Sequence, residues 1–533
     1  MSSVVDPALA QILASSKSAP HLPQRVKTNH AGATWAQTFK YRPELYIQPE
    51  SLEEIEALVN AARQCGRRVV TTGSTHSPST LTCTSSWLVN LDKYNRILSH
   101  DQASGVVTMQ SGIRLYQLSA ELAKLGLAMP NLGSINSQSI AGAISTGTHG
   151  SSLQHGLLSE DIQSLRITLG DGSSKFCSPT ENKELFRATL ISLGALGIIT
   201  EITFRAVPAY DLHWRQSIDR DVKMFNRWTE DLWTHAHYVR VWWFPYTRRA
   251  VVWSAQDTEE PLREPKYSWY DGSLGYYVYH NLLYLAQFLP RTLPWVEWFV
   301  FGMQYGFKDG TVTEAVQHSD KALLMNCLYS QFVNEAPEAL RRLSSWLNHL
   351  TPEDPDYVPH NIPFSAEGLY VHAPVEVRVS DTSNPALDSN RRVTRPYLDI
   401  TARDEATLYL NATLYRPYHA DPPCRARYYE AFEWLMNDLG GRPHWAKNFD
   451  AGGADIERMY GDDLRQWRRV RDQADPDGVF VGAWHRDTVL GNGVKLPNEE
   501  LELARERLWG GGLGYTGTTT GQLKALEAAA SQE

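Results

Sequence analysis

The 533-residue sequence predicts an α+β protein with two strand-containing domains. Three observations support this: short strand and helix patterns alternate up to residue 210, tryptophans become dense beyond it, and the strands there mix aromatic with aliphatic residues. The chain is long enough for two or three domains with substantial cores. We expect a polar arm (1–30), a first domain (31–210), a second domain (211–439), a returning segment (440–490) and a tail (491–533).

The elements of the first domain are predicted from capping and periodicity. Ser51-Leu-Glu-Glu54 forms a capping box, and apolar residues recur after it with helical spacing. Arg67–Thr72 predicts a short strand that leads into a Gly/Ser/Thr loop. A helix is expected over Tyr116–Lys124, and further strands over Trp87–Leu91, Gly105–Gln110 and Leu165–Leu169.

The second domain is expected to contain a large antiparallel sheet. Tyr238–Phe244 and Thr407–Tyr415 have the aromatic and β-branched composition of buried strands. The returning segment is again α+β in character, with a helix expected over Leu464–Asp472.

One stretch of the second domain, residues 276–307, is unusually rich in aromatic and aliphatic residues. Pro290 and Pro294 divide it into two pieces, each too short to span a bilayer. Two interpretations remain open. The pieces either lie on a membrane interface, which suits mixed aromatic and aliphatic side chains, or form a helix pair buried in the fold.

Composition excludes several classes of protein. The net charge of −9 and the lack of a long basic block argue against a nucleic-acid-binding protein. The five cysteines are odd in number and widely spaced, which fits neither a disulfide framework nor a zinc site. The N-terminus lacks a secretory signal pattern, so we expect an intracellular protein that acts on a small molecule.

Two glycine-rich stretches are candidate ligand-binding loops. Gly73-Ser-Thr-His-Ser77 follows a predicted strand and offers backbone N–H groups to an anion such as a pyrophosphate, although such loops are also common turns. Asn131–Gly150 contains four glycines among small hydroxyl residues, so its backbone could approach a flat ligand. It matches neither the dinucleotide-binding nor the P-loop pattern, and a buried turn is the plainer alternative.

Two further motifs bring charged side chains together. Glu376 and Arg378 alternate along a predicted strand and therefore point to the same face. They form either a structural ion pair or a site that orients hydroxyl groups and stabilises a developing anion. His444 and Lys447 are three residues apart, so a helical turn would bring them together.

Taken in order, these motifs resemble the aldonolactone oxidases, which are flavoproteins of the vanillyl-alcohol-oxidase type. The family includes the fungal D-arabinono-1,4-lactone oxidases and the animal L-gulonolactone oxidases. The resemblance runs from about residue 30 to residue 485 and is most specific at His444-Trp-Ala-Lys447. It implies a two-subdomain PCMH-type FAD-binding domain, a cap domain with a large antiparallel sheet flanked by helices, and a returning segment that completes the site.

The resemblance also implies which residues bind FAD. His76 matches the histidine that carries an 8α-linked flavin, and Thr75 departs from the glycine that many members have before it. The other positions that match flavin-binding residues are Gly73, Ser74, Ser77, Gly133, Ser134, Ser139, Gly142, Thr146, Gly147, Thr148, His149, Ile198 and Ile199.

The implied reaction takes a hydride from C2 of a sugar lactone to flavin N5, and dioxygen is reduced to hydrogen peroxide. Glu376 and Lys447 are candidates to hold the C2 hydroxyl and accept its proton. Arg378 would offset negative charge on the reduced flavin, and His444 would position flavin or substrate. Gly133 stands where the oxidases have glycine and the plant dehydrogenases have alanine, which favours dioxygen as the acceptor.

Alternatives remain at this stage. A related oxidase of alditols, gluconolactone or oligosaccharides would share these motifs, and so would a lactone dehydrogenase that uses another acceptor. A flavin-binding or membrane-docking protein without activity is the non-enzymatic alternative. The resemblance places the protein at a mitochondrial membrane, through residues 276–307, although the N-terminus lacks a transit pattern and the cytosol is the other candidate location.

Overall fold

The structure is a computed structural model that describes residues 18–502 with short gaps; the residues not described within that range are 267, 269, 271, 325–330, 333–335, 373, 383–393, 403–404, 413, 492, 495, 497–498 and 501. Most of the expected N-terminal arm and C-terminal tail lies outside the described residues. Residues 18–30, which we expected to belong to the arm, instead pack onto the first sheet, because Ala19 and Leu22 are buried in its core. They include η1 (Leu22–Arg25) and the edge strand β1 (Val26–Lys27).

The first domain, which the resemblance implies is the FAD-binding region and which is called so below, begins with a small, largely parallel sheet. Its order is β1-β4-β6-β5, in which β4 (Leu45–Ile47), β6 (Trp87–Asn90) and β5 (Val69–Thr72) run parallel. Helix α2 (Leu52–Gln64) covers it, and Ser51 Oγ caps this helix by accepting a hydrogen bond from the Glu54 N–H at 3.3 Å. The predicted cap at Ser51 is confirmed, but the capping box is incomplete, because the Glu54 carboxylate accepts from the Glu50 N–H at 2.7 Å and not from the Ser51 N–H. The strands predicted over Arg67–Thr72 and Trp87–Leu91 are confirmed to within two residues. Between β1 and β4 in the sequence, β2 (Gly32–Ala33) and β3 (Lys40–Tyr41) pair to form a short antiparallel ribbon.

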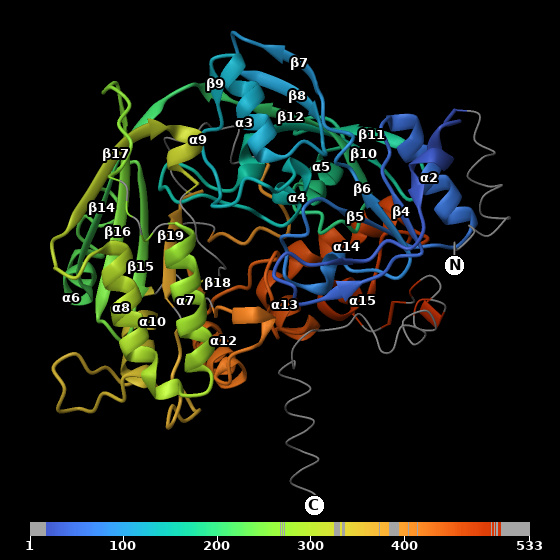
Figure 1. Cartoon of the computed structure of the whole chain (residues 1–533). Helices are drawn as coiled ribbons and strands as arrows, with labels where there is room; N and C mark the ends of the chain where they lie inside the picture. Colours follow the sequence, from blue (N-terminus) through green and yellow to red (C-terminus); the bar gives the residue numbers. More distant parts are fainter. Residues whose placement is uncertain are drawn as a thin grey trace, which may run out of the picture.

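A second sheet of five antiparallel strands completes this region (Figure 1). Its apolar side chains, such as Met109, Leu165 and Ile202, belong to the largest hydrophobic core of the molecule. The strand order is β11 (Ser174–Cys177), β10 (Ile162–Thr168), β12 (Ile198–Arg205), β8 (Val106–Gln110) and β7 (Ile97–Asp101). The accompanying elements are η2 (Thr80–Thr82), α3 (Leu115–Lys124), α4 (Ile140–Ser145), η3 (Leu158–Asp161), α5 (Lys183–Leu190) and the β9 (Leu127–Ala128) and β13 (Val207–Pro208) pair.

The cap domain is built on one seven-stranded sheet, as predicted, and every strand pairing in it is antiparallel. Along its central strands, successive side chains point alternately to the cap's own core and to the side of the first domain. On β19, Val375, Val377 and Val379 face the cap's own core, while Glu376 and Arg378 do not. The strand order is β17 (Val312–His318), β14 (Asp211–Arg220), β16 (Arg249–Thr258), β15 (Tyr238–Phe244), β19 (Val375–Ser380), β20 (Thr407–Ala412) and β18 (Gln331–Phe332).

Helices cover the cap sheet on one side, and the FAD-binding region lies on the other (Figure 1). Residues of α6 (Asp221–Arg227), α10 (Ala336–Leu347) and α12 (Arg425–Asp438) share the core formed by one face of the sheet. The opposite face contributes Tyr238, Trp242 and Tyr409 to the core of the FAD-binding region. The two domains are therefore joined by a continuous apolar interface.

Residues 276–307 form a helical hairpin on the cap. Helix α7 (Ser273–Ala286) runs beside α8 (Leu293–Tyr305), and η5 (Pro290–Thr292) joins them at the two prolines (Figure 1). Neither helix is long enough to cross a membrane, and the same holds for every other helix in the described part of the chain.

The returning segment brings the chain back to the FAD-binding region. Helix α14 (Asp462–Ala474) packs against α5, and Trp467 Nε1 donates to the Ile191 carbonyl at 3.2 Å. The remaining elements are α9 (Ser319–Ala322), η6 (Pro417–His419), α13 (Gly453–Tyr460), α15 (Ala483–His485) and η7 (Arg486–Leu490).

Candidate active site

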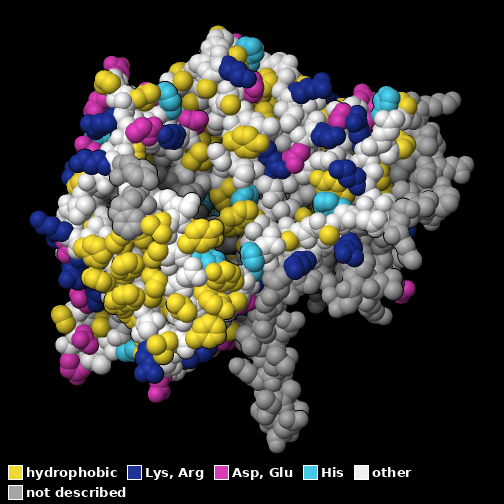
Figure 2. Space-filling model, in the orientation of Figure 1, with side chains coloured by type: hydrophobic (Ala, Val, Ile, Leu, Met, Phe, Trp, Pro, Cys, Tyr) yellow, Lys and Arg dark blue, Asp and Glu magenta, His cyan; other side chains and the backbone are white. Residues whose placement is uncertain are grey.

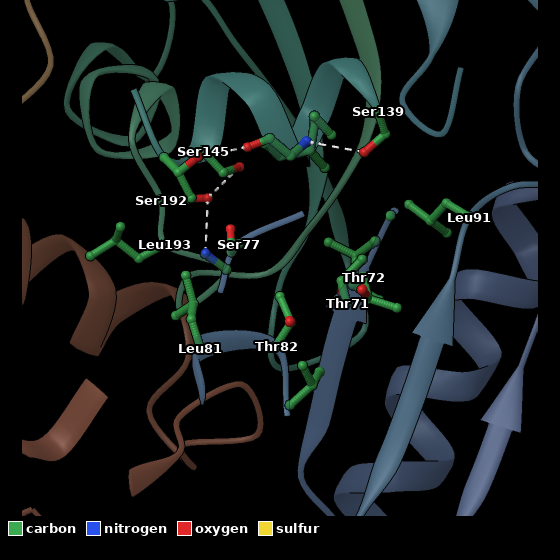
Figure 3. Close-up of a pocket in the computed structure, with 18 of the residues that line it drawn as sticks. Thr71, Thr72, Ser77, Leu81, Thr82, Leu91, Ser139, Ser145, Ser192 and Leu193 are labelled. Carbon is green, nitrogen blue, oxygen red and sulfur yellow. Dashed lines mark hydrogen bonds between the residues drawn. The ribbon is translucent and has the colours of Figure 1, made fainter. Parts of the chain in front are cut away.

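A pocket lies where the two sheets of the FAD-binding region meet (Figure 3). The end of β5 supplies Thr71 and Thr72, and the loop after it supplies residues 73–77. Helix α4 borders the pocket from Ser139 to Ser145, opposite the strand and η2. Phe480 and His485 of the returning segment also line it. The pocket is thus lined by several stretches that are far apart in the sequence.

The loop after β5 holds His76 in a fixed position. Ser137 Oγ lies 2.5 Å from His76 Nε2, and the ring stacks on Trp35 with 5.1 Å between the ring centroids. The other ring nitrogen, Nδ1, is buried and has no hydrogen-bond partner among the described residues. Burial, followed by the charges of Lys447 and Arg114, lowers the pKa of His76 to about 4. A neutral imidazole with one unengaged nitrogen is therefore presented at the pocket.

Thr75 fits this loop despite departing from the family pattern. Its φ of 54° lies in the left-handed region, which disfavours most side chains. The Thr75 hydroxyl donates to the Ala33 carbonyl at 3.3 Å or to its neighbour Ser74 at 2.7 Å, and the Thr75 carbonyl accepts from the Trp35 N–H at 2.8 Å. These bonds hold the residue in place, so the extra side chain does not displace His76.

The lining of the pocket fits the expected FAD. The hydroxyls of Thr72 and Thr82 are buried there without a hydrogen-bond partner among the described residues, so a bound polar group would satisfy them. The chain also approaches itself closely. A Cβ on Gly112 would lie 1.9 Å from the Leu91 carbonyl oxygen, and one on Gly73 would lie 2.5 Å from Ser139 Oγ. Glycine is therefore required at Gly112, where the obstacle is backbone, whereas a side chain at Gly73 would have to displace the Ser139 hydroxyl.

A charged cluster lies on the face of the cap sheet that meets the FAD-binding region. Arg378 Nε donates to Glu376 Oε1 at 2.7 Å, and Asn411 Nδ2 on the neighbouring strand donates to Glu376 Oε2 at 3.3 Å. Arg378 Nη2 also donates to Ser134 Oγ of the FAD-binding region. All four residues are at least nine-tenths buried. The predicted pairing of Glu376 with Arg378 is therefore confirmed. The hydrogen bond from Arg378 to Ser134 extends this cluster across the domain interface.

Two histidines and a lysine surround this cluster. The ring of His149 stacks on Tyr409 with 3.4 Å between centroids, and it lies 5.7 Å from the ring of His444. His444 and Lys447 belong to one turn, because the Lys447 N–H donates to the His444 carbonyl at 2.9 Å. The spacing argument for these two residues is confirmed, although the turn is isolated and not part of a helix.

Burial and mutual repulsion shift the pKa values of these groups. Burial, then the charges of Lys447 and Arg378, lower the pKa of His444 to about 3. Burial, then the Arg378 charge, lower the pKa of Lys447 to about 8, while Glu376 acts in the opposite sense. The pKa of His149 is also held well below its usual value, first by burial. The histidines are therefore neutral near pH 7, and Lys447 titrates close to it.

The predicted flavin-binding residues divide between these two places. The pocket and the cluster adjoin, because Thr146 lines the pocket and His149, three residues further on, lies beside His444 in the cluster. Ser134 and His149 belong to the cluster, and Gly133, Gly147 and Thr148 do not line the pocket. The predicted residues that do line it are Gly73, Ser74, Thr75, His76, Ser77, Ser139, Gly142, Thr146, Ile198 and Ile199.

Several residues of the site were missed from the sequence. Asn411 and Tyr409 could have been found from the strand period, because they pair with Glu376 and Arg378 across β19 and β20. Arg240 follows from the same logic, since the register of β15 with β19 places it beside Arg378. Arg240 is fully buried, and its Nη2 donates to the Leu323 carbonyl at 2.7 Å. His485 carried no local signal, because only the return of the chain brings it to the pocket.

Comparison with known proteins gives a consistent family. Residues 202–488 match the family described as D-arabinono-1,4-lactone oxidase, and residues 43–178 match a FAD-binding domain family. A putative D-arabinono-1,4-lactone oxidase of Neurospora crassa is 56% identical over 93% of each chain. The D-arabinono-1,4-lactone oxidase of Yarrowia lipolytica is 43% identical over 85% of this chain and 96% of its own, and that of Saccharomyces cerevisiae is 36% identical over 89% and 98%.

Solved structures agree on the fold. Cholesterol oxidase from B. sterolicum superposes with a TM-score of 0.65 at 16% identity, over 87% of this chain and 98% of its own. Xylooligosaccharide oxidase from Myceliophthora thermophila gives a TM-score of 0.60 at 15% identity, over 86% and 93%. These likenesses show the PCMH-type FAD-binding fold with its cap.

We predict that His485 makes the FAD-binding region sensitive to acid. Burial lowers its pKa to about 4, so the folded protein binds this proton less readily than the unfolded chain, whose histidine pKa is about 6.5. The contribution of neutral His485 to the free energy of unfolding is complete above pH 6.5 and is lost as the pH falls toward 4. The loss amounts to roughly 2 kcal/mol at pH 5. In His485→Gln the melting temperature should fall less between pH 7 and pH 5 than in the wild type. An unchanged difference would contradict this role, and His100→Gln at an exposed position serves as the control.

Proposed function

The chain belongs to the D-arabinono-1,4-lactone oxidase family and is an FAD-dependent oxidoreductase; we propose that it oxidises aldono-1,4-lactones, with D-arabinono-1,4-lactone as the substrate and dioxygen as the acceptor. The observation that carries this proposal is the buried cluster of Glu376, Arg378, His444 and Lys447 beside the His76 pocket. Neutral hydrogen-bonding groups and one titratable amine next to a flavin site suit the oxidation of a secondary alcohol.

FAD supplies the two-electron acceptor, which dioxygen can reoxidise. The residues of the chain handle the substrate hydroxyl. Asn411 and Glu376 present polar groups that can hold it, and Lys447 accepts its proton. Lys447 suits this role because a base is most effective when its pKa lies near the working pH. Glu376 is less suited to it, because both of its oxygens already accept hydrogen bonds.

Arg378 offsets the negative charge that the site gains during the reaction. Its guanidinium is fixed by Glu376 on one side and by Ser134 on the other, so it needs no reorganisation when that charge appears. His444 is also fixed, since its Nδ1 accepts a hydrogen bond from the Ala446 N–H at 3.0 Å and its ring interacts with the Gly147 backbone. We infer that His444 positions flavin or substrate as a neutral group.

Gly133 supports dioxygen as the acceptor. A Cβ at this position would lie 3.0 Å from Thr148 Cγ2 and 3.4 Å from the His149 carbonyl oxygen. A methyl group there would crowd Thr148 and the chain that carries His149, so the glycine of the oxidases fits this backbone and the alanine of the dehydrogenases would require a shift.

We predict that D-arabinono-1,4-lactone bleaches the visible flavin band of the purified enzyme without oxygen, and that air restores the band with formation of hydrogen peroxide. Slow restoration of the band in air would identify a dehydrogenase and contradict the inference from Gly133 that dioxygen is the electron acceptor. A bound flavin that does not bleach with this lactone would contradict the proposed substrate; gluconolactone and alditols, tested in parallel, would then identify the substrate class.

We propose that the flavin is bonded covalently to His76. The geometry supports it, because Ser137 engages Nε2 and leaves Nδ1 without a partner among the described residues. A low pKa keeps the ring neutral and therefore nucleophilic.

We predict that acid precipitation of the wild-type enzyme carries the flavin down with the protein, whereas His76→Ala leaves it in the supernatant. Ser137→Ala is the matched variant: it retains the attachment residue but frees the ring, so it should form the bond more slowly. Flavin that remains attached in His76→Ala would assign the bond to another residue.

We predict that the rate of flavin reduction rises with pH and levels off above about pH 8 in the wild type, because Lys447 must be deprotonated to accept the proton. Lys447→Met should slow reduction by at least about tenfold and remove this pH dependence. Lys124→Met, at an exposed position, is the control. A wild-type rate that falls with pH would show that the protonated lysine is the active form.

We also propose that the helical hairpin contacts a membrane surface. The inner side chains of α7 and α8 are buried, and the outer ones form an exposed apolar surface (Figure 2). The inner side of the hairpin is therefore buried in the fold, as one alternative from the sequence expected. The exposed outer side supports the proposal of a membrane contact. Helix α7 contains no charged residue, and the one acid of α8, Glu297, is fully buried. The members of this apolar surface are Leu274, Tyr276, Tyr277, Leu285, Phe288, Leu289, Trp295, Trp298 and Tyr418. An apolar surface with tryptophan and tyrosine, whose exposed charge within the hairpin is the single cation Arg291 at the turn, suits a bilayer interface. A mitochondrial location stays a prediction.

We predict that the wild-type enzyme floats with vesicles of phosphatidylcholine and phosphatidylglycerol, and that the triple variant Leu285→Ser, Phe288→Ser, Trp295→Ser binds them at least about tenfold more weakly. Tyr116→Ser, at an exposed aromatic residue on α3, is the control. Equal flotation of the triple variant and the wild type would contradict the proposed contact.

A further inference from the structure

A second cavity lies directly behind the apolar surface. Its volume is about 180 Å³, and it shares no lining residue with the His76 pocket. Its walls come from α7, from the start of α8, and from two cap segments around Leu369 and Leu414. It is therefore a separate site, bounded on one side by the hairpin that we place at a membrane.

The cavity and the apolar surface are two sides of the same helix turn. Leu283 and Ala286 of α7 are buried and line the cavity. Between and after them, Leu285 is 61% exposed and Phe288 is 71% exposed. A molecule held by the apolar surface therefore needs to pass only the edge of one helix to reach the cavity.

The lining suits a hydrocarbon chain. Leucine, proline and alanine side chains make up most of it, and a cavity of about 150 Å³ with such walls is already large enough to hold a benzene ring. His372 lies at the wall, but its Nε2 is engaged by the Tyr279 hydroxyl at 2.5 Å. Burial lowers the pKa of His372 to about 4, so it adds no charge near neutral pH.

The charge at the rim indicates what the chain would be attached to. Among the described residues that line the cavity, Arg427 is the one with a charge, and it is exposed. Its Nη2 donates to the Ser365 carbonyl at 2.5 Å and to the Glu367 carbonyl at 3.0 Å, which orients the guanidinium at the rim. Arg291 follows directly after the lining residue Pro290, Glu367 directly precedes the lining residue Gly368, and both are exposed. Two cations and one exposed acid leave the rim of this apolar cavity with net positive charge, which complements an anionic headgroup with a hydrocarbon tail.

We propose that this cavity binds a segment of one acyl chain of an anionic phospholipid, with the phosphate at Arg427. The proposal rests on the membrane contact proposed above and makes it specific: the enzyme draws one lipid chain out of the bilayer surface in addition to lying on it. The binding is non-covalent and leaves the His76 pocket free.

The test uses the purified holoenzyme and monomeric lipid, so that it does not depend on a membrane. Myristoyl-lysophosphatidylglycerol, kept below its critical micelle concentration, is titrated by isothermal titration calorimetry. We expect saturable binding of one lipid per chain. Ala286→Trp fills the cavity without changing the apolar surface and should weaken binding at least about tenfold. Phe288→Ser changes the surface without changing the cavity lining and should bind this lipid within about twofold of the wild type.

Arg427→Glu provides a second variant, at an exposed position that folding tolerates more easily than the buried Ala286. It should weaken binding of the anionic lipid, and it should change binding of myristoyl-lysophosphatidylcholine, which has no net charge, much less. The flavin spectrum and the lactone turnover of all three variants should match those of the wild type, because none of these residues belongs to the active site.

Three results would overturn the proposal. The first is the absence of saturable binding by the wild type, and the second is equal binding by Ala286→Trp and the wild type. The third is tighter binding of free myristate than of the phospholipid, which would assign the cavity to free fatty acids. Vesicle flotation separates these results from failure of the membrane contact itself. Wild-type protein that floats while Ala286→Trp floats equally well and binds lipid equally well would retain the membrane contact and remove the lipid site.

Discussion

The buried ion pair of Glu376 and Arg378 constrains how the two domains meet. Strand β19 turns its valines into the cap's own core, so its polar residues necessarily face the FAD-binding region. Charges removed from water are stable only with close partners, and breaking such a pair costs about 3–5 kcal/mol. Those partners come from both domains, since Ser134 accepts from Arg378 and Asn411 donates to Glu376. The cap therefore cannot separate from the flavin-binding domain without exposing unsatisfied charge, and the active site is as rigid as that interface.

The same constraint sets the electrostatic character of the site. Arg378, Lys447 and the neighbouring Arg240 provide more positive charge than Glu376 offsets, and burial makes each charge act strongly on its neighbours. Burial, and after it this positive charge, keep His76, His149 and His444 neutral and lower the pKa of Lys447. A site that is biased toward positive charge before the reaction is prepared for the negative charge that the reaction brings. The charge that we propose to stabilise the product therefore also favours the neutral form of Lys447, which we propose as the base.

The spacing of residues along the sequence predicted part of the candidate site, and the packing of the two domains determined the rest. The two-residue repeat of a strand was enough to pair Glu376 with Arg378, and the three-residue spacing was enough to join His444 and Lys447. The bond between Arg378 and Ser134 joins residues 244 positions apart, so no local pattern could indicate it. The hairpin was ambiguous for a different reason: both of its faces are apolar, so periodicity could not show which face is buried. Residues 18–30 were placed wrongly in a free arm because two buried side chains in a polar stretch give little signal.

The burial of Glu297 explains how an uncharged hairpin is anchored to a polar domain. Its Oε1 accepts the N–H groups of Tyr246 and Thr247, both at 2.9 Å, at the turn between β15 and β16. Burial raises the pKa of this carboxyl to about 8, so at neutral pH the neutral form predominates and the hairpin adds no charge to the apolar surface. Because this carboxyl ionises near pH 4.5 in the unfolded chain, its contribution to stability is complete only below that pH and is lost progressively as the pH rises from about 4.5 to about 8. An anionic membrane attracts protons as it attracts other cations, and therefore favours this neutral form. The anchoring of the hairpin and the membrane contact that we propose for it thus depend on the same protonation state.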